Sequence, residues 1–155
     1  MTIIFGEGCS GKSSLALEMA KKHTSLKNEK VIYFALDNDK SLERKIVSCP
    51  KIEYKHINSP IMLDIEFAIE EDTSFIVIDS INWIKSNSLK DIIRSLDYIE
   101  SVYKVEVIAI YNTLRMVDAS SKILIDACKG TKMKMWATSK KSKKVTAKRE
   151  SSNRG

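Results

Sequence analysis

The segment Gly6–Ser13 constrains this chain more than any other, because it fits the phosphate-binding pattern G-x-x-x-x-G-K-[ST]. Thr2–Phe5 before it has the apolar character of a buried strand, and Ser14–Lys22 after it suits a helix. In that context backbone N–H groups form a concave anion site at the positive end of a helix dipole. The pattern therefore predicts a nucleoside triphosphate site, the alternative being an ordinary glycine-rich turn. The predicted binding residues are Gly6, Glu7, Gly8, Cys9, Ser10, Gly11, Lys12, Ser13 and Ser14.

Two side chains of this loop and one distant aspartate predict a magnesium site. We expect Lys12 to place its ammonium on the β- and γ-phosphates, and the Ser13 hydroxyl to bind Mg²⁺. Asp79 follows four apolar residues, which is the Walker B pattern, and its carboxylate would share that Mg²⁺ through water. The alternative for Asp79 is a helix N-cap.

Four more polar residues that follow apolar runs are candidates for catalysis. Asp37 comes directly after the apolar run 31–36 and could orient or deprotonate an attacking water, with Asp39 as the fallback. Asn112 and Thr113 follow the run 105–111 and could sense the γ-phosphate or that water. Ordinary caps and turn residues are the alternatives for all of them.

Apolar runs and helical patterns alternate along the chain and predict an α/β fold with a mostly parallel central sheet. Helices are expected at 40–47, 61–69 and 89–102, and an edge strand at 52–57. Residues 122–126 and 132–138 are expected to pair as a C-terminal β-hairpin around Lys129–Thr131. In such sheets ligands bind at the carboxyl ends of the strands, which would gather the candidate residues on one edge.

The net charge of +6 is unevenly distributed. Residues 129–155 hold ten Lys or Arg against one acid, Glu150, which leaves 16 basic and 19 acidic residues in 1–128. We expect an ATPase domain at 1–138 and a basic, disordered tail at 139–155 that binds nucleic acid by counterion release; the alternative is a solubilising tail. The residues predicted to contact nucleic acid are Lys140, Lys141, Lys143, Lys144, Lys148 and Arg149.

Composition excludes several other classes of protein. The sequence has no apolar run long enough to span a membrane and no secretory leader, so no membrane partner is expected. Its three cysteines are widely spaced and suggest neither a disulfide framework nor a zinc site. A reducing cytoplasm is therefore the expected location, which would be the host cytoplasm if the protein is viral.

The order of these segments resembles the RecA-like ATPase core of RecA recombinases, DnaB-type helicases and KaiC-like proteins. Residues 6–13 resemble its Walker A loop, 75–80 its Walker B strand, and 110–116 the strand end that carries its glutamine sensor and an arginine. The resemblance implies a three-layer P-loop fold, ATP and Mg²⁺ as cofactors, and DNA as a partner. It also implies a homo-oligomer in which a neighbouring subunit supplies a catalytic arginine, and Arg115 is the arginine to test for that role. It also suggests a minimal core of viral or plasmid origin.

The sequence departs from the family where Asp37 replaces the usual Glu and where Thr113 or Asn112 replaces the usual Gln. Our first hypothesis is a DNA-dependent ATPase in recombination, repair or replication. The second is a weakly hydrolysing or non-hydrolysing accessory or loader protein switched by ATP. A small-molecule kinase is the third, and it is disfavoured because no arginine-rich lid segment precedes the tail.

Overall fold

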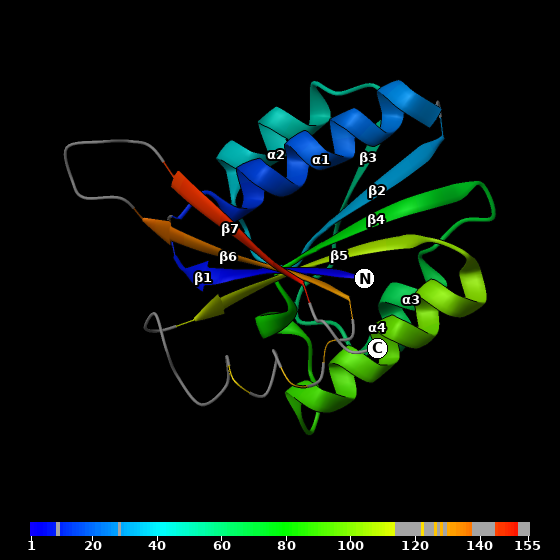
Figure 1. Cartoon of the computed structure of the whole chain (residues 1–155). Helices are drawn as coiled ribbons and strands as arrows, with labels where there is room; N and C mark the ends of the chain where they lie inside the picture. The colour runs from blue at the N-terminus through cyan, green and yellow to red at the C-terminus, as the bar shows by residue number, and fades with distance from the viewer. Residues whose placement is uncertain are drawn as a thin grey trace.

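Strands and helices alternate along most of the chain (Figure 1). The structure, a computed structural model, describes residues 1–8, 10–27, 29–113, 122, 126, 128, 130–137 and 145–151. Its strands are β1 (Thr2–Glu7), β2 (Lys30–Ala35), β3 (Ile52–His56), β4 (Thr73–Asp79), β5 (Glu106–Thr113), β6 (Thr131–Ala137) and β7 (Val145–Ser151). Its helices are α1 (Lys12–Lys27), α2 (Lys40–Val47), α3 (Met62–Phe67), α4 (Leu89–Tyr103) and the short 3-10 helix η1 (Ile81–Trp83).

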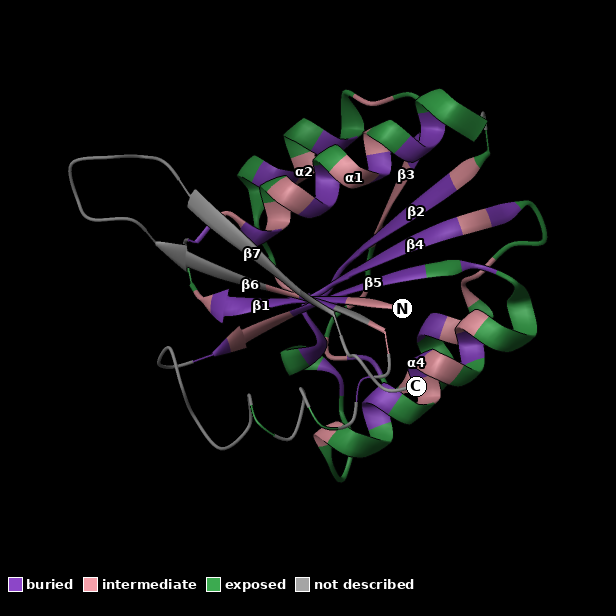
Figure 2. Ribbon diagram, viewed as in Figure 1, coloured by how far each residue is buried: buried purple, intermediate pink, exposed green. Residues whose placement is uncertain are grey.

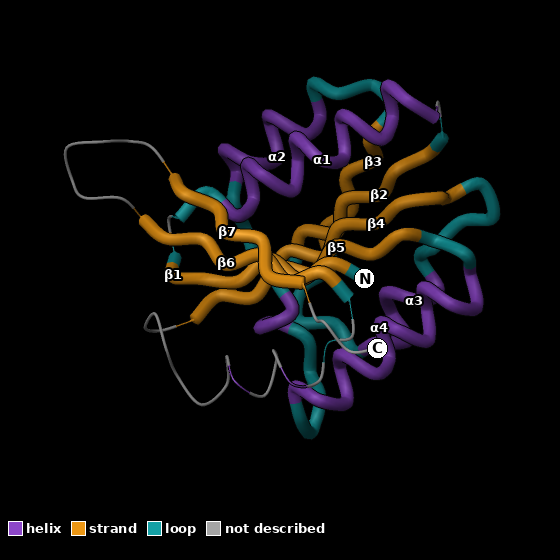
Figure 3. The backbone as a smooth tube through the Cα atoms, viewed as in Figure 1, coloured by secondary structure: helices purple, strands orange, loops and turns teal. Residues whose placement is uncertain are grey.

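The strands form a sheet in the order β3-β2-β4-β5-β1-β6-β7. Strands β1 to β6 are parallel to their neighbours, and β7 is antiparallel to β6. Helices α1 and α2 cover one face and α3 and α4 cover the other, so the molecule has three layers (Figures 1 and 3). The predicted α/β fold with a mostly parallel sheet is confirmed, and a C-terminal hairpin is present, although between other segments than expected.

Each face of the sheet has its own apolar core, because side chains alternate along a strand. One core packs Ile78 and Phe34 against apolar residues of α4 such as Ile93. The other packs Tyr33 and Val77 against α1 and α2, through residues such as Leu17. The central strands are buried on both faces while the outer helix surfaces are exposed (Figure 2). This explains why those strands are almost continuously apolar.

Strand β1 lies inside the sheet between β5 and β6, which places the loop after it at the centre of one edge. The chain passes very close to the start of β1 at Gly130, where a Cβ atom would lie 1.9 Å from the Met1 carbonyl oxygen. Only glycine avoids this overlap, and its presence lets β6 begin directly beside β1.

Two expectations about the C-terminal region were wrong. The hairpin joins β6 to β7, with Met133 in register with Arg149, and not 122–126 to 132–138, since Lys122 and Asp126 lie in helical conformation. Residues 145–151, expected in a disordered tail, form β7 instead. The physical reason is that β6 has one side paired to β1, and a strand on its other side satisfies backbone groups that would stay open at a sheet edge.

Among the helices that the structure describes, none is long and apolar enough to cross a lipid bilayer.

Candidate nucleotide site

The phosphate-loop segment connects the end of β1 to the first turn of α1. Gly11 has φ 85°, a backbone conformation that side chains disfavour, and its carbonyl accepts the Leu15 N–H at 3.0 Å. Lys12 is 4% exposed, and its ammonium donates to the Glu7 carbonyl oxygen and, at 3.0 Å, to Ser10 Oγ. The loop thus holds a buried positive charge at the N-terminus of a long helix, as a phosphate site requires.

The structure brings Ser13 and Asp79 together from two motifs that lie 66 residues apart in the sequence. Ser13 Oγ donates to Asp79 Oδ2 at 2.6 Å, and Tyr33 OH donates to the same oxygen at 2.7 Å. Burial raises the pKa of Asp79, while these two hydrogen bonds and the charge of Lys12 lower it. The net effect is a raised pKa, and the donors around Asp79 offset part of the cost of burying its charge.

Asp37 lies beside Asp79 at the same sheet edge. The Leu36 N–H donates to the Asp79 carbonyl oxygen at 2.7 Å, which fixes the chain just before Asp37 against the end of β4. Burial raises the pKa of Asp37, and the negative charges of Asp79 and Asp39 raise it further. Asp39 has another task, since its Oδ1 accepts the Leu42 N–H at 3.1 Å and caps α2.

The end of β5 lies beside the phosphate loop, with Asn112 in register with Gly6 and Thr113 with Glu7. Asn112 is tied to the segment after β4, because its Nδ2 donates to Ser80 Oγ at 3.2 Å. Asn82 in η1 also bonds the Asn112 backbone, donating to its carbonyl at 2.9 Å and accepting its N–H at 2.8 Å. The two candidate sensors therefore sit on a braced strand end.

A cavity of about 480 Å³ joins these parts of the site. It is lined by Gly8, Ser10, Gly11, Lys12, Ser13, Ser14, Asp37, Asp39, Asp79 and Asn112. Within the described residues, the buried side-chain oxygens that lack a hydrogen-bond partner are Asp37 Oδ1 and Thr113 Oγ1. Unpaired buried oxygens are uncommon in folded proteins, and finding both at the carboxyl edge of the sheet fits a place completed by a ligand or water.

The donor set fits Mg²⁺ and a triphosphate. A hydroxyl and a carboxylate 2.6 Å apart are hard oxygen ligands of the type that Mg²⁺ takes while keeping several waters and phosphate oxygens. No cluster of three or more His, Cys, Asp or Glu side chains in the described part of the chain is arranged to hold a metal by itself. A metal at this site would therefore share its coordination with the nucleotide.

Sequence reasoning missed three contributors to the site: Tyr33, Ser80 and Asn82. Tyr33 is hidden in an apolar run, and its bond to Asp79 depends on the pairing of β2 with β4, in which Ala35 is in register with Asp79. The sequence offered one signal for this contact: Tyr33 lies two residues before Ala35, and residues two apart in a strand point to the same face of the sheet. Ser80 and Asn82 follow Asp79 directly, and that proximity was the only available signal for them.

Several predicted residues are outside what the structure describes. Cys9, Arg115, Lys140, Lys141, Lys143 and Lys144 are among them, and of Lys148 and Arg149 the structure describes only the backbone, in β7. Their predicted roles stay predictions.

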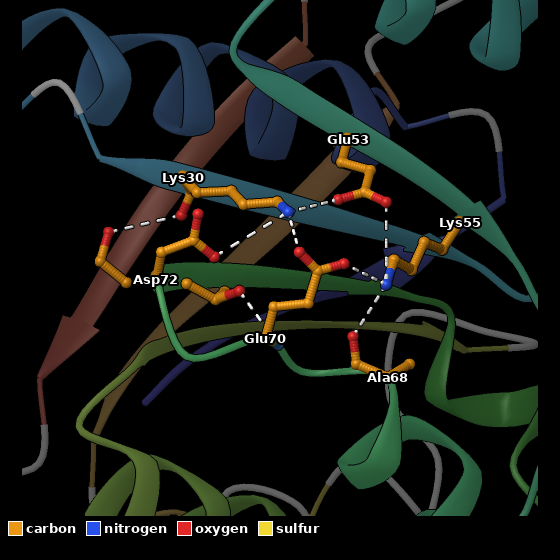
Figure 4. Close-up of polar contacts among 8 residues, drawn as sticks. Lys30, Glu53, Lys55, Ala68, Glu70 and Asp72 are labelled. Atoms are coloured by element: carbon orange, nitrogen blue, oxygen red, sulfur yellow. Dashed lines mark hydrogen bonds and ion pairs between the residues drawn. The ribbon is translucent and has the colours of Figure 1, made fainter.

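A separate polar cluster joins β2, β3 and the segment that precedes β4 (Figure 4). The Lys30 ammonium contacts Glu70 closely and Glu53 at 2.9 Å, and Lys55 contacts Glu70 at 2.9 Å. These pairings lower the pKa of Glu70 to about 2. Since the lysines are already surrounded by carboxylates, the cluster has the character of a structural ion-pair network and not of an anion site.

Comparison with protein families identifies the chain. The family model described as chromatin associated protein KTI12 matches residues 1–89, more than half of the sequence, including the phosphate loop and Asp79. The chain belongs to this family. The comparison with curated proteins found no match to the chain.

Solved structures show the fold of this KTI12-family chain to be that of the KaiC-like, RecA-like P-loop ATPases. A KaiC-like protein from the archaeon Pyrococcus horikoshii is 15% identical with a TM-score of 0.61, covering 96% of this chain and 76% of that one. The flagellar accessory protein FlaH from Methanocaldococcus jannaschii is 16% identical with a TM-score of 0.68, covering 98% and 78%. The predicted RecA-like core is thus confirmed at the level of fold.

Proposed function

We propose that this protein binds ATP with Mg²⁺ at the site between the phosphate loop and Asp79, hydrolyses it, and acts on DNA in recombination, repair or replication. The observation that carries the proposal is the 2.6 Å contact between Ser13 Oγ and Asp79 Oδ2 in a cavity that also holds Lys12. This arrangement joins the two halves of a magnesium–triphosphate site across 66 residues of sequence.

Each residue has a distinct part in the proposed reaction. Lys12 and the loop N–H groups bind the phosphates, and Ser13 and Asp79 hold Mg²⁺, which when bound neutralises charge on the phosphate oxygens. Asp37 Oδ1, buried and unpaired, accepts a proton from the water whose oxygen bonds to the γ-phosphorus as the bond to the β-phosphate bridging oxygen breaks. Thr113 and Asn112 orient that water or the γ-phosphate from the end of β5.

The DNA part of the proposal is supported by charge. Ten Lys or Arg lie in residues 129–155 against one acid, and a cationic segment of this kind binds nucleic acid by releasing counterions. The family description, a chromatin associated protein, favours the same partner. A cytoplasmic location, the host cytoplasm if the protein is viral, and a homo-oligomer in which Arg115 acts at the nucleotide site complete the proposal.

One observation favours a second candidate, an ATP-switched accessory protein with little turnover. Burial and the charges of Asp79 and Asp39 raise the pKa of Asp37, and a raised pKa reduces the share of the ionised form that a general base needs. In that case ATP would stabilise one conformation without being consumed. The two candidates differ in phosphate release and agree in ATP binding.

The test is calorimetry with ATP and Mg²⁺, followed by steady-state phosphate release with single-stranded, duplex and no DNA. Lys12→Ala should abolish ATP binding, while the matched control Lys22→Ala, an exposed lysine of α1, should leave it intact. Turnover that rises with DNA supports the first candidate. ATP binding without turnover supports the second, and the absence of any Lys12-dependent ATP binding would reject both.

A further inference from the structure

The side chain of Tyr33, in β2, contacts the proposed magnesium ligand Asp79, and the proposed function gives Tyr33 no role. Its hydroxyl donates to Asp79 Oδ2 at 2.7 Å, and the whole residue is 0% exposed. Its neighbours in the core are apolar side chains of α1, α2 and the sheet, including Leu17 and Val77. A phenol that is buried in an apolar layer and directed at a carboxylate is placed there for its hydroxyl as well as its ring.

The register of the sheet explains how Tyr33 reaches the site. Ala35 of β2 is in register with Asp79 of β4, and Tyr33 lies two residues earlier on the same face. The long phenol side chain spans this diagonal, which a shorter side chain could not do. Tyr33 is fully buried in this core, and the packing around it fixes the position of the hydroxyl.

Tyr33 is a donor to Asp79 and not an acceptor. The Tyr33 hydroxyl is the donor of this pair because a carboxylate oxygen can only accept a hydrogen bond. Asp79 Oδ2 therefore accepts two hydrogen bonds, one from Tyr33 and one from Ser13. Ser13 belongs to the phosphate loop, whereas Tyr33 belongs to a buried strand, so the bond from Tyr33 holds Asp79 independently of what the loop binds.

We propose that Tyr33 is a positioning residue for the magnesium site: its buried hydroxyl fixes the Asp79 carboxylate toward Ser13, so that the metal meets a preset ligand. The proposal rests on the proposed function, because it concerns the same ATP–Mg²⁺ site. Partners that orient a metal ligand generally change metal affinity when they are removed.

The variant that isolates the hydroxyl is Tyr33→Phe, which keeps the ring in the core. Tyr54→Phe is the matched control, because Tyr54 is in register with Tyr33 on the adjacent strand β3 and does not line the nucleotide cavity. ATP binding is measured by calorimetry at fixed ATP over a range of Mg²⁺ concentrations. We expect the half-saturating Mg²⁺ concentration to rise about tenfold in Tyr33→Phe and to stay unchanged in Tyr54→Phe. Equal Mg²⁺ dependence in the two variants would overturn the proposal.

A second measurement covers the case in which Tyr33→Phe does not fold. The full chain is labelled with ¹³C at Cζ of its five tyrosines, and its spectrum is compared with that of Asp79→Asn without nucleotide. We expect one tyrosine resonance, still present in Tyr54→Phe, to move in Asp79→Asn; if none responds, Tyr33 does not hold Asp79. A chain that shows this response but binds no ATP would refute the proposed function and leave the Tyr33–Asp79 bond standing.

Discussion

Asn82 and Asn112 are joined by a reciprocal pair of hydrogen bonds, in which the Asn82 side chain pairs with both backbone polar groups of Asn112. The Asn82 amide donates to the Asn112 carbonyl at 2.9 Å and accepts the Asn112 N–H at 2.8 Å. Asn82 follows Asp79 by three residues, and Asn112 precedes Thr113. The pair therefore links the segment that carries the proposed magnesium ligand to the strand end that carries the proposed sensors.

We expect Asn82→Ala to lower ATP turnover by about 10- to 100-fold while changing ATP affinity little. The reason is that small displacements of groups around the reacting atoms cost rate heavily, whereas the phosphate loop that binds ATP is untouched. Steady-state phosphate release and calorimetry measure the two quantities. Asn82→Asp keeps the acceptor and loses the donor, so its turnover should lie between those of the unchanged protein and of Asn82→Ala. The control is Asn87→Ala, at an exposed asparagine before α4. A loss of affinity equal to the loss of rate would contradict this role.

Asp37→Asn is expected to lower turnover at least about 100-fold, the usual contribution of a general base. It should also raise the melting temperature. Burial and the charges of Asp79 and Asp39 raise the pKa of Asp37, so its ionisation disfavours the folded state at neutral pH. This destabilisation is present above the raised pKa of Asp37 and disappears as the pH falls toward the pKa of an ordinary Asp side chain. The Asp37→Asn variant lacks the destabilisation over the whole pH range. Phosphate release and thermal unfolding from pH 4 to 8 measure both effects.

The comparison variant for Asp37 is Asp39→Asn, since asparagine caps a helix about as well as aspartate. Asp39 accepts the Leu42 N–H, and this bond should survive the substitution. Loss of turnover in Asp39→Asn with normal turnover in Asp37→Asn would show that the base is Asp39.

Local patterns sufficed for most of the fold. The strands and α-helices up to residue 113 were predicted because each carries its own apolar periodicity, whereas the short helix η1 was not; the predicted helix 40–47 has the bounds of α2. Contacts that depend on the pairing of strands were not predictable: Tyr33 meets Asp79 only because β2 and β4 align as they do. Strand β7 was missed because its composition is basic and polar, and the partner that favours it, β6, is not visible in the local sequence.

Lys30→Ala is expected to lower the melting temperature slightly at neutral pH and low salt, and the difference should shrink at high salt. The ion pairs of Lys30 are partly exposed, so they are screened by solvent and ions. Lys30 and Lys55 lower the pKa of Glu70 to about 2 from 4.5, so the stability that Glu70 contributes is present above pH 4.5 and lost as the pH falls toward 2. As the pH falls from 4.5 toward 2, Lys30→Ala should therefore lose less stability than the unchanged protein does.

Thermal unfolding between pH 2 and 7 tests this prediction, with Lys27→Ala at the exposed end of α1 as the control. If the two variants show the same pH dependence, the network around Glu70 contributes nothing measurable to stability.

The basic segment is best tested by substitutions, because deleting residues 139–155 would also remove β7 and open the edge of β6. We expect a variant with glutamine at Lys140, Lys141, Lys143 and Lys144 to bind single-stranded DNA with a salt dependence that is weaker by about three units of slope, since each phosphate contact contributes about 0.7. ATP affinity should not change, because none of these lysines belongs to the phosphate loop or to the proposed magnesium ligands. Substituting the exposed lysines Lys22, Lys27, Lys45 and Lys90 in the same way removes the same charge and is the control. Equal slopes for the two variants would show that net charge alone, and not this segment, accounts for DNA binding.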